Sequence, residues 1–221
     1  MDASPPPLTP ANLASVLSAF TGVTVAVSAG GFLASSSPYA QEAQLVANAV
    51  ESRCREFFSG RHHARQALSQ IGYAAAPILK GEKGNPLWPV GILGSITHDL
   101  DQVVVAVMPA SNQRGFGIDL VLDPTRIEAT LQPLIARSDE LAKLSIAFEN
   151  VPSLALAFSL KESVVKAISP TIDCYLDLLD IELSVMDGRI SAYLAQFNVH
   201  IKCGFIALPN GLFSFARLKN Q

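Results

Sequence analysis

The chain has 221 residues, 49% of them hydrophobic and 16% charged, so it is long and apolar enough to bury a substantial core. Its formal net charge of -3 argues against nucleic acid as the main partner. The three widely spaced cysteines contain no CxxC pair, which argues against a disulfide framework or a zinc knuckle and indicates a reducing compartment.

The amino-terminal part of the chain predicts neither a secretory signal nor a membrane span. No Lys or Arg precedes Arg53, and the uncharged residues 3–41 are interrupted by Ser, Thr, Gly and Pro before about 18 consecutive apolar residues accumulate. We expect a cytoplasmic protein. Residues 9–20 predict a first helix, and "VTVAVS" (23–28) predicts a short buried strand.

Residues 38–71 predict two helices that are broken at "SGR", with Ser59 as the N-cap of the second. Arg61 and Arg65 are four residues apart and should share one helix face. Residues 81–95 predict a loop rich in Gly and Pro. The continuously apolar "VVVAVM" (103–108) predicts a strand that is buried on both faces.

The rest of the chain repeats this mixture of helices and strands. "GFGIDLV" (115–121) predicts a strand, and helices are expected up to about residue 137, over 138–148 and over 152–169. Alternation then predicts four strands within residues 178–218. The fold class is therefore α+β, with α/β-like character, in two similar subdomains at 1–121 and 122–221.

Charge is distributed unevenly along the chain. Residues 53–83 carry six Lys or Arg against two carboxylates, whereas residues 119–187 carry twelve carboxylates against five Lys or Arg. A basic and an acidic region together suit a polyanion bound with a divalent cation. Two ordinary solvated surfaces are the alternative.

Four motifs stand in order along the chain: "SGRHHARQAL" (59–68), "GNPLWPVGILGSITH" (84–98), "GFGIDL" (115–120) and "FSLKESVVKA" (158–167). In order and spacing they resemble the motifs of the monomeric 4'-phosphopantetheinyl transferases of the surfactin and enterobactin-synthase type. The resemblance implies transfer of the phosphopantetheine arm of coenzyme A to a serine of an apo acyl or peptidyl carrier protein, with release of adenosine 3',5'-bisphosphate. It further implies a monomer in which a pseudo-twofold axis relates the subdomains and the active site lies in the cleft between them.

The resemblance also assigns residues. Asp119 and Glu162 would bind Mg²⁺, Glu162 would accept the serine proton, and Lys166 would stabilise the leaving oxygen. On the helix of residues 152–169, Ser159, Glu162 and Lys166 share one side, although a simple helix-stabilising pair is the alternative for Glu162 and Lys166. The groups expected to bind coenzyme A are Arg61, Arg65, Lys83, Ser95, Thr97, His98 and Lys166.

Two positions depart from the family pattern. Val121 stands where a second acidic metal contact is common, and Asn85 stands where many members have a lysine, whose charge Lys83 would replace. We expect Trp88 to be a structural plug beside the nucleotide, with stacking on the adenine as the alternative. We expect Lys161 to be a surface residue that contacts the helix or the substrate.

Two other functions remain as alternatives. Ser95, His98 and Asp119 are the residue types of a hydrolase triad, but the G-x-S-x-G pattern is missing around Ser95. The other alternative is a catalytically degenerate module that binds coenzyme A or a carrier protein and has lost its metal chemistry with Val121.

Overall fold

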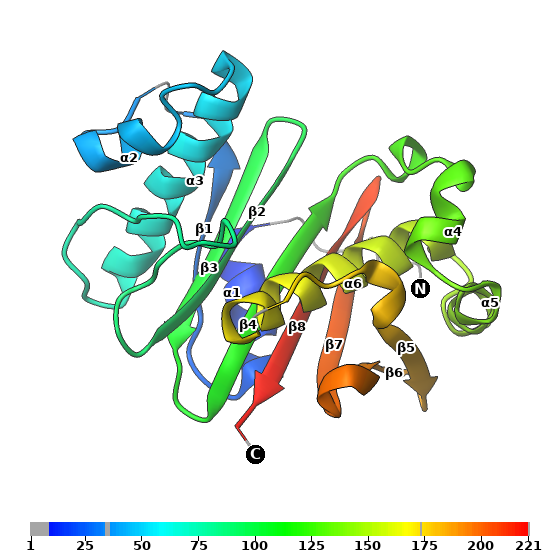
Figure 1. The fold of residues 1–221 in the computed structure, drawn as a ribbon. Coiled ribbons are helices and arrows are strands. Elements are labelled where there is room, and N and C mark those ends of the chain that lie inside the picture. Colours follow the sequence, from blue (N-terminus) through cyan, green and yellow to red (C-terminus); the bar gives the residue numbers. More distant parts are fainter. Residues whose placement is uncertain (1–8, 34–35, 173, 221) are drawn as a thin grey trace. The chain divides into compact units, whose positions relative to one another are not determined.

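The computed structural model describes residues 9–33, 36–172 and 174–220. They form two compact units, residues 9–111 (the first unit) and residues 112–220 (the second unit), each containing helices and an antiparallel sheet (Figure 1). The predicted α+β class is confirmed. The pseudo-twofold relation and the cleft stay predictions.

The first unit contains a three-stranded sheet in the order β1-β3-β2, with β3 (Gln102–Pro109) in the centre. Val103 to Met108 have no exposed surface, so the strand expected to be buried on both faces is confirmed. The long helix α3 packs against β1 and β3 (Figure 1). The other elements of this unit are α1 (Pro10–Thr21), β1 (Ala26–Gly31), α2 (Ala40–Leu45), α3 (Glu51–Gln70) and β2 (Ile92–Asp99).

The break expected at "SGR" is wrong, because α3 continues through Ser59, Gly60 and Arg61. Ser59 is not an N-cap: it is buried, and its hydroxyl accepts a hydrogen bond from the backbone N–H of Leu33 at 3.1 Å. A Cβ at Gly60 would lie 3.2 Å from Cγ2 of Ile96 on β2. The serine and the glycine therefore serve the packing of α3, and the helical region is divided earlier, between α2 and α3.

The prediction of a loop over residues 81–95 is wrong for its last residues, because strand β2 already begins at Ile92. A Cβ at Gly94 would lie 2.7 Å from the Trp88 ring, so a glycine in this edge strand gives the indole room. Trp88 packs on the core of the first unit, in keeping with the expected structural plug.

The second unit contains a five-stranded sheet in the order β4-β8-β7-β6-β5, one face of which is covered by α6 (Figure 1). The predicted helices over 138–148 and 152–169 are confirmed, whereas the helix expected before residue 137 is mostly 3-10 turns. The strands are β4 (Gln113–Val121), β5 (Glu182–Met186), β6 (Arg189–Leu194), β7 (Val199–Leu208) and β8 (Gly211–Lys219). The helices are η1 (Pro124–Arg126), η2 (Ala129–Leu131), α4 (Gln132–Ile135), α5 (Ser138–Ala147), α6 (Ser153–Ile168), η3 (Ser169–Thr171), η4 (Leu178–Asp180) and η5 (Ala195–Phe197).

The structural division falls at residues 111 and 112, ten residues before the expected boundary at 121. The reason is that β4 pairs along its whole length with β8, so Asp119 lies opposite Ser214 in the register. Residues 113–121 therefore belong to the sheet of the second unit. Within the described part of the chain, no helix has the length and apolar character needed to cross a membrane.

Candidate active site

The packing of α6 on β4 determines which side chains meet in the second unit. A Cβ at Gly117 would collide with the carbonyl oxygen of Ser163, and one at Gly115 would collide with that of Ala167. Both glycines are therefore required for the close approach of α6 to the strand. Because side chains alternate along a strand, Asp119 lies on the same face as these glycines and points toward α6.

Asp119 is buried, and its two carboxylate oxygens accept hydrogen bonds from different residues of α6. The ammonium of Lys166 donates to Oδ1 at 2.5 Å, and the hydroxyl of Ser159 donates to Oδ2 at 2.8 Å. The Ser214 hydroxyl, on β8, lies 2.8 Å from the Ser159 hydroxyl. Two residues of α6 thus hold the carboxylate of Asp119, and two of the sequence-predicted site residues, Asp119 and Lys166, are in direct contact.

Glu162 lies on the same side of α6, between Ser159 and Lys166. Its pKa is raised above the ordinary value, first because burial disfavours the charged form and then because of the nearby negative charge of Asp119, while Lys166 acts in the opposite direction. Among the described residues it makes no hydrogen bond or ion pair. A half-buried carboxylate with a raised pKa and no fixed partner is suited to accept a proton.

The donor set of this cluster fits a hard cation such as Mg²⁺, which usually takes one or two protein carboxylates together with phosphate oxygens and water. Asp119 and Glu162 supply two carboxylates that are close enough to influence each other electrostatically. No group of three or more His, Cys, Asp or Glu side chains that could hold a metal occurs among the described residues. Val121 lies on the same face of β4 as Asp119, but it is buried in the apolar core of the second unit.

Lys161 is not the surface residue that the sequence indicated. Its side chain has no exposed surface, and its ammonium lies 2.9 Å from Oε2 of Glu140 on α5. Burial lowers the pKa of Lys161, which Glu140 partly opposes. Within "KES", Lys161 therefore points into the core, while its neighbour Glu162 points to the site.

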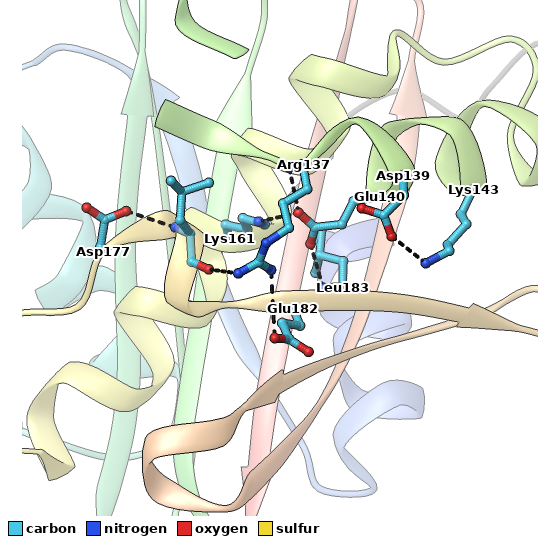
Figure 2. A network of polar contacts seen from close by, with 9 residues as sticks. Arg137, Asp139, Glu140, Lys143, Lys161, Asp177, Glu182 and Leu183 are labelled. Atoms are coloured by element: carbon cyan, nitrogen blue, oxygen red, sulfur yellow. Dashed lines mark hydrogen bonds and ion pairs between the residues drawn. The ribbon is translucent and has the colours of Figure 1, made fainter. Parts of the chain in front are cut away.

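Glu140 joins three segments (Figure 2). Besides Lys161, its carboxylate accepts hydrogen bonds from the backbone N–H of Arg137, at the start of α5, and from that of Leu183, on β5. The distances are 2.9 and 2.8 Å. This buried network holds α6 against α5 and the sheet, and it thereby fixes which side of α6 Glu162 and Lys166 occupy.

Arg61 and Arg65 of the first unit do project from one side of α3, but both are packed against protein. Nε of Arg61 donates to the carbonyl oxygen of Ile78 at 3.1 Å, and its guanidinium lies over the ring of Phe57. Burial is the largest cause that lowers the pKa of Arg61, to about 10. Arg65 forms an ion pair at 2.6 Å with Glu42. Their predicted role in binding phosphate stays a prediction.

Glu42 is a residue that the sequence analysis missed. It is fully buried on α2, and its Oε1 accepts hydrogen bonds from Arg65 and, at 2.8 Å, from the backbone N–H of Ile78. The same residue, Ile78, is thus held by Glu42 through its N–H and by Arg61 through its carbonyl. This arrangement fixes the start of the segment that leads to Lys83, which is itself exposed.

Ser95, Thr97 and His98 all lie on β2, but not on one face. Alternation along the strand places Ser95 and Thr97, both buried, on one face and His98 on the other. The His98 side chain is 33% exposed, and its Nε2 lies 3.8 Å from Glu56 of α3. Because Ser95 and His98 point to opposite faces, the nucleophile–base pair of the hydrolase alternative is absent.

Models of one protein family match both halves of the chain. Residues 41–108 match the family model of the 4'-phosphopantetheinyl transferase N-terminal domain, and residues 115–204 match that of the 4'-phosphopantetheinyl transferase superfamily. The two matches contain the four motifs.

Several curated proteins are similar to this chain. The 4'-phosphopantetheinyl transferase PptT of Mycobacterium tuberculosis is 46% identical over 37% of this chain and 36% of its own length. The 4'-phosphopantetheinyl transferase Svp of Streptomyces mobaraensis is 36% identical over 66% of this chain and 61% of its own. Enterobactin synthase component D of Escherichia coli is 32% identical over 69% of this chain and 73% of its own.

The chain belongs to the 4'-phosphopantetheinyl transferase family. It spans less than two thirds of the length of the first relatives that it matches, between 36% and 61%.

Proposed function

We propose that this chain transfers the 4'-phosphopantetheine arm of coenzyme A to a serine of an apo acyl or peptidyl carrier protein. The serine oxygen forms a bond to the β-phosphorus, the bond from that phosphorus to the bridging oxygen breaks, and adenosine 3',5'-bisphosphate leaves. The observation that carries the proposal is Glu162, a half-buried carboxylate with a raised pKa beside the Asp119–Lys166 pair, within a chain of this family.

The residues of the second unit have distinct roles in this reaction. Glu162 accepts the proton of the attacking serine, directly or through water. Lys166, whose side chain is 29% exposed, stabilises the oxygen of the departing phosphate. Asp119 and Glu162 would hold Mg²⁺, which supplies charge neutralisation at the pyrophosphate.

The first unit supplies cations and donors for the phosphates of coenzyme A. The residues proposed for this role are Arg61, Arg65, Lys83, Ser95, Thr97 and His98. Arg65 is partly neutralised by Glu42, and Arg61 is mostly buried, so His98 and Lys83 are the more accessible of the charged or ionisable groups. The monomeric state and the cytoplasmic location stay predictions.

The test is incubation of the purified protein with coenzyme A, Mg²⁺ and an apo carrier domain, followed by mass spectrometry of the carrier. A gain of one phosphopantetheine group is expected. Binding of coenzyme A or of the carrier without modification would instead favour the degenerate module.

A further inference from the structure

Two buried serines of the second unit, one on α6 and one on β8, neither bind coenzyme A nor transfer a proton in the proposed reaction. Ser159 on α6 and Ser214 on β8 have no exposed surface. Ser159 contacts Asp119 Oδ2, and Ser214 lies directly opposite Asp119 in the register of β4 and β8. The aspartate is therefore bordered by hydroxyl groups from the helix above it and from the neighbouring strand.

The number of hydrogens on each hydroxyl decides which group donates in the contacts among Ser214, Ser159 and Asp119. Each serine hydroxyl has one hydrogen to donate. The Ser214 hydroxyl donates to the backbone carbonyl of Ser159 at 2.7 Å, and the Ser159 hydroxyl donates to Asp119. A charged acceptor makes the stronger hydrogen bond, so the hydroxyl of Ser159 donates to the carboxylate of Asp119. The hydroxyl of Ser214 then stabilises the position of Ser159 through the backbone carbonyl of that residue.

Lys166 and Ser159 donate to Asp119 from different surroundings. Lys166 reaches Oδ1 from a partly exposed position, whereas Ser159 reaches Oδ2 from the buried side. The terminal torsion of an aspartate is broad, so a single donor would leave the carboxylate plane poorly fixed. Two donors on different oxygens fix both the plane and which oxygen faces Lys166.

We propose that Ser159, supported by Ser214, is a positioning residue that holds the carboxylate of Asp119 in the orientation needed for cation binding and phosphoryl transfer. This inference rests on the proposed function of the same site. Ser159 touches neither coenzyme A nor the carrier in this scheme and acts only through Asp119. The competing explanation is that the two serines merely attach α6 to β8.

The chain offers a matched control on the same helix. Ser163 is also fully buried on α6, but its hydroxyl donates to the carbonyl oxygen of Leu160 at 2.7 Å and does not contact Asp119. Ser159→Ala and Ser163→Ala therefore remove the same atom from the same helix at similar burial. Only the first removes a donor from the carboxylate.

The experiment compares these variants with Ser214→Ala and Ser159→Thr, which keeps the hydroxyl. The readouts are the melting temperature, kcat and KM for coenzyme A, and binding of Mn²⁺ alone measured by electron paramagnetic resonance. Loss of a hydrogen bond to a metal-binding carboxylate typically costs about 10- to 100-fold in metal affinity or activity. We expect a loss of that size in kcat and Mn²⁺ affinity for Ser159→Ala with KM little changed, a smaller loss for Ser214→Ala, and recovery in Ser159→Thr.

Equal effects of Ser159→Ala and Ser163→Ala on kcat and Mn²⁺ affinity would overturn the positioning role. If Ser159→Ala does not fold, Ser214→Ala with unchanged kcat and Mn²⁺ affinity would overturn it as well. A wild-type protein that transfers no phosphopantetheine contradicts the proposed function, whereas an active wild type with an unaffected Ser159→Ala contradicts only this inference.

Discussion

The ammonium of Lys161 and the carboxylate of Glu140 lie 2.9 Å apart, and their side chains are 0% and 4% exposed. The two residues are 21 positions apart in the sequence and come from different helices. Since Lys161 directly precedes Glu162, this buried pair fixes the rotation of α6 from the side opposite the site.

We expect Lys161→Met to destabilise the protein by about 3–5 kcal/mol, because it leaves the carboxylate of Glu140 buried without its counter-charge. The free energy of unfolding from urea denaturation measures the effect. Lys143→Met is the control: Lys143 pairs with Asp139 at 2.7 Å, but both side chains are more than half exposed, so the change should leave the free energy of unfolding nearly unchanged. An equal decrease in the free energy of unfolding in the two variants would show that burial of the Lys161–Glu140 pair does not make its loss more costly.

Gly117→Ala should prevent normal packing of the second unit. Its Cβ would collide with the backbone carbonyl of Ser163, which cannot move without displacing α6. Gly31→Ala on β1 is a suitable comparison, since its Cβ would make an ordinary contact of 3.6 Å with Asp101. Circular dichroism and thermal melting should show a large loss for the first and a small one for the second, and a stable Gly117→Ala protein would contradict the close approach of α6 to β4.

Glu162→Gln and Asp119→Ala should nearly abolish transfer. A positioned general base contributes about 10²- to 10⁴-fold, and the amide of glutamine cannot accept the proton. The rate of carrier modification, followed by mass spectrometry, measures the loss. Glu149→Gln, at an exposed position, should leave the rate unchanged. Wild-type turnover in Glu162→Gln would remove this residue from the mechanism.

The carboxyl group of Glu162 should titrate above the ordinary range of a glutamate, because burial and the charge of Asp119 both favour its protonated form. The rate of transfer should therefore fall with decreasing pH while an exposed glutamate is still ionised. Asp119→Asn removes a negative charge and should lower the pKa of Glu162, whereas Lys166→Met should raise it further. Carboxyl ¹³C NMR titration detects both shifts without relying on activity, and shifts in the opposite directions would contradict the arrangement.

We expect the free energy of unfolding of the first unit to depend on pH because of His63. It is buried on α3 with Nδ1 2.8 Å from the Ser28 hydroxyl, and burial is the main cause that lowers its pKa. The unfolded chain therefore binds a proton more readily than the native protein, so the free energy of unfolding should decrease as pH falls below about 6.5. His63→Gln should flatten this dependence and His62→Gln should not. An unchanged slope in His63→Gln would show that other groups cause it.

The parts of the structure that the sequence predicts well are those in which local pattern and packing agree. The helix that contains Glu162 and the strand that contains Asp119 were predicted, because both segments are mostly apolar and are mostly buried in the structure. Contacts to distant segments explain the errors. Ser59 and Gly60 have the sequence pattern of a helix boundary, but they pack against Leu33 and Ile96, and no local pattern contains that information.

The sequence also predicts the candidate site only in part. The motifs identify Asp119, Glu162 and Lys166, and the structure brings Asp119 and Lys166 into contact. By contrast, the orientation of Lys161 depends on Glu140, and that of Arg65 depends on Glu42. The position of a Glu in the sequence does not indicate whether it is exposed or fully buried, so neither partner was foreseen.

The contact of α6 with the backbone of β4 through Gly115 and Gly117 also bears on protein engineering. At these two positions no side chain separates the helix from the strand, so no side chain can be shortened or lengthened there to tilt the helix by a small amount. Redesign of this protein should therefore leave these two positions unchanged and vary the exposed chain segments instead.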